Sequence, residues 1–167
     1  LRTSFVLGRN GGALATLAVY GMRKYIFASK AAEPIHMIGQ MKTAQESWRE
    51  EFHAYYDVSS SITAYYPADP DNKKRHWTNQ SHADWGKWQH FPVTTPNPVY
   101  FGYAIVAGGP GGTPPSPATA QTFNWPNPTT EPWYVIQAVG NFDEDDVYSR
   151  FVSSSFTQEI YAENEGE

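Results

Sequence analysis

The stretch from Ser29 to Tyr56, SKAAEPIHMIGQMKTAQESWREEFHAYY, carries apolar side chains three or four residues apart. This spacing places them on one face of a helix, with Lys42, Glu46 and Glu50 on the opposite face. The pattern extends back to Ala13 in phase, so it predicts one long helix. Its apolar members are Leu17, Tyr20, Ile35, Ile38, Met41, Ala44, Trp48, Phe52 and Tyr55.

Strand signals appear only in the last part of the chain. Residues 57–98 are rich in Asp, Asn, Ser and Pro and show no sustained period, which is typical of a long surface loop. Apolar and β-branched runs then begin at Val99, Glu131, Val147 and Glu159. Each of these runs predicts a short strand.

A long helix followed by a loop and antiparallel strands indicates the α+β class. We expect the N-terminal helix to pack on the C-terminal antiparallel β-sheet. Pro34 removes one backbone donor and should kink the helix. Gly8, Gly11 and Gly12 favour partial unwinding at the amino end, since each glycine weakens a helix.

Composition excludes several functions. The 167 residues suit a single domain, and the net charge of −5 gives no basic surface for nucleic acid. The chain has no cysteine, so disulfides, thiol catalysis and thiolate zinc sites are excluded. The longest apolar run, ALATLAVYG, is shorter than the ~20 residues that span a membrane.

Three segments together resemble one known family. AVYGMRKYIFASKAAEPIHMIGQMKTAQESWREEFHAYYDVS from Ala18 is similar to the N-terminal helix of bacterial type IV pilins, including their Y-x-x-x-S-K-A-x-E pattern at Tyr25 to Glu33. PVYFGYAIVAG and AVGNFDEDDVYSRFVSSSFTQEIYAENEGE resemble the sheet of pilin-like proteins. The resemblance covers about two-thirds of the chain and implies a pilin-like fold.

The resemblance also implies a function, a location and partners. It predicts the major structural subunit of an extracellular type IV pilus-like filament for adhesion or motility, not an enzyme. Identical subunits would form a helical polymer at the cell surface, after assembly by membrane machinery. Three regions are expected: residues 1–28 in the filament core, residues 29–56 as the amphipathic half of the helix, and residues 57–167 as a loop-rich β domain. A pseudopilin of a type II secretion system is the alternative within this resemblance.

The two halves of the helix are expected to make different contacts. Nothing in the chain itself covers the apolar residues of the first half, so we expect them to pack against other copies. These self-assembly residues are Leu14, Leu17, Val19, Tyr20 and Ile26. The residues expected to pack between helix and sheet are Ile38, Trp48, Phe52 and Tyr55.

The acidic stretch GNFDEDDV is a candidate calcium site. Asn141, Asp143 and Asp145 occupy alternate positions, so their oxygen atoms suit a hard cation, although an ordinary acidic turn is the competing interpretation. No other cofactor is expected. His76, His82, Asp84 and His90 lack the spacing of a zinc site and are interpreted as polar surface.

A function of another class remains open from the sequence. Trp77, Trp85 and Trp88 would serve as stacking platforms if the chain were a secreted carbohydrate-binding module. No nucleophile motif or pair of catalytic carboxylates is present. Thr and Ser in GGTPPSPATAQT are candidates for O-linked glycans.

Overall fold

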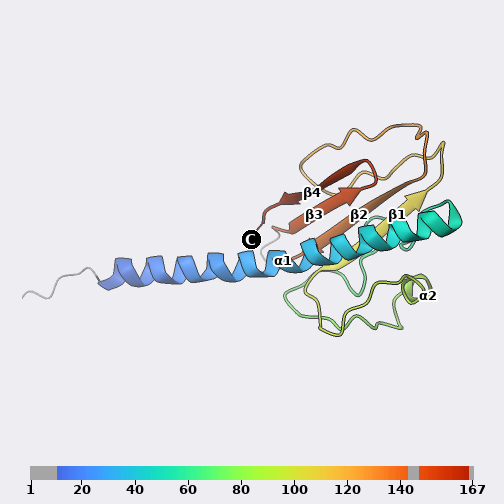
Figure 1. Cartoon of the computed structure of the whole chain (residues 1–167). Helices are drawn as coiled ribbons and strands as arrows, with labels where there is room; N and C mark the ends of the chain where they lie inside the picture. The colour runs from blue at the N-terminus through green and yellow to red at the C-terminus, as the bar shows by residue number, and fades with distance from the viewer. Residues whose placement is uncertain (1–10, 143–146, 166–167) are drawn as a thin grey trace, which may run out of the picture.

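The computed structural model describes residues 11–142 and 147–165, and for residues 11–15, 23–24 and 26–28 it describes the backbone alone. A helix that protrudes from a body of strands and loops dominates the molecule (Figure 1). The elements in chain order are α1 (Gly11–Phe52), α2 (Trp85–Trp88), β1 (Gly102–Gly108), β2 (Trp133–Gly140), β3 (Ser149–Ser154) and β4 (Thr157–Glu163).

The helix α1 is continuous over 42 residues, with Pro34 inside it. At 1.5 Å per residue its length is about 63 Å, so it extends well beyond the body. It ends at Phe52, because His53 adopts a φ of 56° and donates its backbone N–H to the Arg49 carbonyl at 2.8 Å. The chain then turns back toward the sheet.

The four strands form one antiparallel sheet in the order β1-β2-β3-β4. The register pairs Ile105 with Ile136 and Ala138 with Phe151, so these side chains share one face. Val135 and Val152 belong to the opposite face, where the connection between β1 and β2 covers them with Phe123 and Trp125. All eight residues of β2 are therefore buried.

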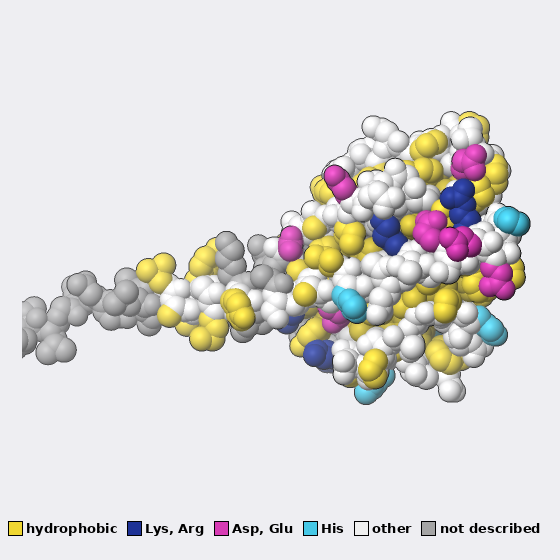
Figure 2. Space-filling model, viewed as in Figure 1, with side chains coloured by type: hydrophobic (Ala, Val, Ile, Leu, Met, Phe, Trp, Pro, Cys, Tyr) yellow, Lys and Arg dark blue, Asp and Glu magenta, His cyan; other side chains and the backbone are white. Residues whose placement is uncertain are grey.

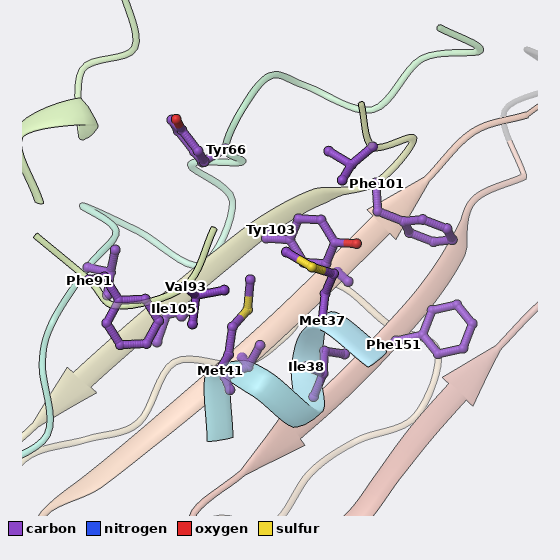
Figure 3. Close-up of a cluster of buried hydrophobic side chains, with 14 of the residues drawn as sticks. Met37, Ile38, Met41, Tyr66, Phe91, Val93, Phe101, Tyr103, Ile105 and Phe151 are labelled. Carbon is purple, nitrogen blue, oxygen red and sulfur yellow. The ribbon is translucent and has the colours of Figure 1, made fainter. Parts of the chain in front are cut away.

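The main core lies between the sheet and the carboxyl half of α1. Met37, Ile38 and Met41 point from α1 toward Tyr103 and Ile105 of β1 (Figure 3). All five side chains are buried. The helical spacing of Met37, Ile38 and Met41 places them on the side of α1 that faces the sheet. Tyr103 and Ile105 lie two residues apart on β1, so both face the helix.

The exposed edge of β1 is covered by the segment that follows α1. Tyr66 and Tyr103 exchange both backbone hydrogen bonds, at 2.8 and 2.7 Å. Ser59 donates its N–H to the Ile105 carbonyl at 2.7 Å, and its Oγ accepts the Ile105 N–H at 3.1 Å. These bonds satisfy the edge groups that would otherwise pair with another chain.

The expected fold, one long helix packed on the sheet in the manner of a pilin, is wrong. The section of helix that accompanies the four-stranded sheet is Ser29–Phe52, about 24 residues, and the fold is only partly α+β. Before this section the described side chains of α1 are exposed, since the body does not extend beneath them. The expected unwinding at Gly11 and Gly12 is also absent from the described backbone, because α1 begins at Gly11.

Candidate self-assembly surface

The protruding part of α1 presents large apolar side chains to solvent. Leu17, Tyr20 and Tyr25 are 67%, 68% and 77% exposed, and Val19 and Met22 are exposed as well. Hydrophobic side chains recur along this part of the molecule (Figure 2). We call the residues from Thr16 to Met22, together with Tyr25, the ridge. Every residue of the ridge is uncharged and exposed.

Three of the expected self-assembly residues therefore belong to the ridge: Leu17, Val19 and Tyr20. The side chains of the other two, Leu14 and Ile26, lie outside the described residues. Met22 and Tyr25 were missing from the expected set. Met22 is three residues after Val19, and Tyr25 is three residues after Met22, so the helical spacing contained a signal for both.

Where α1 reaches the body, the side chain of Glu33 binds the segment that precedes β1 through hydrogen bonds. Its carboxylate accepts the backbone N–H groups of Tyr100 at 3.0 Å and Phe101 at 3.1 Å, and the hydroxyl of Tyr103 at 3.1 Å. Burial raises the pKa of the Glu33 carboxyl above its ordinary value, while these hydrogen bonds act in the opposite direction. Lys30, one turn earlier, lies 4.8 Å from the ring centre of Tyr100.

The residues expected between helix and sheet occupy two different environments. Ile38 is fully buried, and Tyr55 is buried with its ring centre 4.7 Å from that of Tyr134 on β2. Trp48 is only half-buried, and Phe52 is 51% exposed. Both lie in the last turns of α1, beyond the core. Their rings pack on each other at 4.5 Å, so the expectation that Phe52 packs on the sheet needs correction.

A groove of about 840 Å³ runs beside the carboxyl half of α1. We call it the α1 groove. Ile35, Gly39, Thr43 and Ser47 line it along the helix, and residues 92–94 line it from the loop. The described residues around it include no Lys, Arg, Asp or Glu. No pattern in the sequence predicts this groove, because it depends on a loop that packs beside α1 only in the folded chain.

The structure tests the metal candidates only in part. Asn141 is buried at the end of β2, whereas Asp143 and Asp145 lie outside the described residues, so the calcium site stays a prediction. No cluster of three or more metal-binding side chains occurs in the described part of the chain. His82 instead accepts the N–H of Asp84 through Nδ1 at 3.1 Å and contacts the Tyr65 carbonyl through Nε2 at 2.9 Å.

Two of the three tryptophans considered for carbohydrate stacking are core residues. Trp77 and Trp88 are buried around Tyr66, whose ring stacks on Trp88 at a centre-to-centre distance of 4.8 Å. Trp85 is partly buried beside them. These side chains hold the loop of residues 57–98 in place. Their faces are used within the chain, so they do not form an exposed platform for a sugar ring.

Among the described residues, no helix is both long enough and apolar enough to span a membrane. No protein-family model matches the chain, and no match was found among curated proteins or solved structures.

Proposed function

We propose that this protein is the structural subunit of an extracellular filament and that it polymerises through the protruding part of α1. The observation that carries the proposal is the exposure of Leu17, Val19, Tyr20, Met22 and Tyr25 along one helix. Full burial of each large apolar side chain contributes about 1.5–3 kcal/mol. A subunit that leaves all of them in water gains free energy by covering them against another copy.

The body supports this role because it holds the second half of α1 and leaves the ridge exposed to solvent. Glu33 and the core residues around Ile38 hold the second half of the helix. The first half then projects as a rod that neighbours can surround. The pilin-like sequence features favour a cell-surface filament for adhesion or motility, assembled by machinery at the membrane. No observation specifically favours the pseudopilin or carbohydrate-binding alternative.

Sedimentation and electron microscopy of the full chain test the proposal. We expect the wild-type chain to form fibres that pellet, and Leu17→Asp to prevent them. An unpaired charge in the buried contact costs roughly 3–5 kcal/mol per subunit. Thr122→Asp places the same charge on an exposed loop and should leave assembly unchanged.

Tryptophan fluorescence separates lost assembly from lost folding. The chain has 6 tryptophans, and all of them lie at or after Trp48, so their emission reports the body. Leu17→Asp should keep the wild-type emission and unfolding curve. Fibres of normal length and amount from Leu17→Asp would show that the ridge is not the assembly surface, and a wild-type chain that stays monomeric would overturn the proposed function.

A further inference from the structure

We infer that the α1 groove of one subunit receives the ridge of a second copy. This inference rests on the proposed function and names the surface to which the ridge binds. The groove and the ridge belong to the same continuous helix, so a ridge cannot reach the groove of its own chain. A second copy offers the ridge without any change in the fold.

The two surfaces match in their lack of described charged side chains and in their shape. The described side chains of the groove and of the ridge include no Lys, Arg, Asp or Glu; Arg23 and Lys24 lie between Met22 and Tyr25 in the sequence, and their side chains lie outside the described residues. The ridge is convex, since it is one bare helix about 10 Å wide. The groove is concave and has a volume of about 840 Å³. The described side chains of the ridge would bury apolar area in the groove and would bring no charge into it.

Three of the polar side chains in the groove, His36, Gln40 and Thr43, have hydrogen-bond partners within the subunit. Gln40 donates through Nε2 to His36 Nε2 at 3.1 Å, and the Thr43 hydroxyl donates to the Gly39 carbonyl at 3.1 Å. An apolar helix can cover these groups without breaking their hydrogen bonds. This lowers the free-energy cost of burial, which is highest for polar groups that lack a hydrogen-bond partner.

Gly39 points to a close approach from outside the subunit. A Cβ atom built at Gly39 meets nothing within 4 Å, so no contact in the chain requires glycine there. Glycine within a helix is less favourable than alanine. The absence of a side chain at the floor of the groove does, however, let the backbone of a second helix come near.

The inferred contact has a defined register. Tyr20 at the middle of the ridge and Thr43 at the middle of the groove are 23 residues apart on α1, which corresponds to about 35 Å along the helix axis. Contacting subunits should therefore be displaced by about this distance. Because groove and ridge are different surfaces, the contact does not close on itself and adds subunits indefinitely.

Engineered cysteines test the register, since the natural chain has none. We expect assembled Tyr20→Cys/Thr43→Cys chains to give a ladder of disulfide-linked multimers on oxidation. Leu17→Cys/Thr43→Cys and Tyr20→Cys/Ser47→Cys sample neighbouring registers, because a disulfide needs Cα atoms about 4.4–6.8 Å apart. Tyr20→Cys/Thr122→Cys is the control, with its second cysteine on an exposed loop away from the groove.

A bulky substitution tests the groove independently of cross-linking. Gly39→Phe should fold normally and lose fibre formation at least tenfold, measured as the pelleted fraction. Gly86→Phe adds the same bulk at another exposed helical glycine with nothing within 4 Å, and should assemble like the wild type. Fibres that depend on Leu17 but tolerate Gly39→Phe, with no cysteine pair above the control, would overturn the groove contact and leave the proposed function intact. A wild-type chain without fibres would overturn both.

Discussion

The side-chain amide of Gln45 binds both backbone groups of Tyr56. Gln45 Nε2 donates to the Tyr56 carbonyl and Gln45 Oε1 accepts the Tyr56 N–H, each at 2.8 Å. Gln45 is fully buried on α1, and Tyr56 lies just after the helix ends. The pair therefore holds the returning chain against the helix, at the point where α1 meets the segment that covers β1.

Gln45→Leu should destabilise the body markedly. The substitution keeps a side chain of similar size but leaves the N–H and C=O of Tyr56 without their partner, at an expected cost of about 2–4 kcal/mol. Urea unfolding followed by tryptophan fluorescence measures this free energy. Gln40→Leu, an exposed amide on the same helix, should change it by less than about 0.5 kcal/mol. Equal effects of the two substitutions would contradict the role given to Gln45.

Ile38 and Phe52 should differ sharply in their contribution to stability, although both belong to the apolar pattern of α1. Ile38→Ala removes a fully buried side chain from the core and should cost about 2–5 kcal/mol. Phe52→Ala removes a ring that is 51% exposed and should cost less than about 1 kcal/mol, most of it from the contact with Trp48. The same urea experiment compares them. A loss at Phe52 as large as that at Ile38 would place Phe52 in the core after all.

The sequence could predict the elements whose burial follows from a local period. Ile38, Met41 and Ala44 are buried because the helical spacing puts them on the side that faces the sheet. The apolar run around Ile136 becomes a strand that is buried on both faces. In each case the signal lies within about ten residues and needs no knowledge of distant partners.

Other features depend on distant contacts that no period encodes. Trp48 and Phe52 continue the apolar pattern of α1, but the core ends before they are reached along the helix. Trp48 is therefore only half-buried and Phe52 is exposed, despite the same spacing. From the sequence alone, Glu33 is expected to be a charged residue on the surface of the helix. Only the fold brings the Tyr100 N–H to its carboxylate. The α1 groove likewise needs Val93 beside the helix. Such sites arise from tertiary packing, which overrides local preference.

Glu33 should make stability depend on pH. Its folded-state pKa lies above the ordinary value of 4.5, chiefly because burial disfavours the carboxylate, although hydrogen bonds from Phe101, Tyr100 and Tyr103 and the charge of Lys74 oppose the shift. The folded state therefore holds this proton more tightly than the unfolded chain. The resulting stabilisation is fully present below pH 4.5 and is lost as the pH rises through the folded-state pKa.

Glu33→Gln should remove this component, because the amide does not titrate and can still accept a backbone N–H through its oxygen. We expect the free energy of unfolding of the wild type, relative to Glu33→Gln, to fall as the pH rises from about 4 to about 7. Urea unfolding at several pH values measures the difference between the two proteins, in which the other titrating groups cancel. Glu50→Gln, an exposed carboxylate on the same helix, is the matched control and should follow the wild type. Parallel curves for wild type and Glu33→Gln would show that Glu33 binds its proton equally tightly in the folded and unfolded chain.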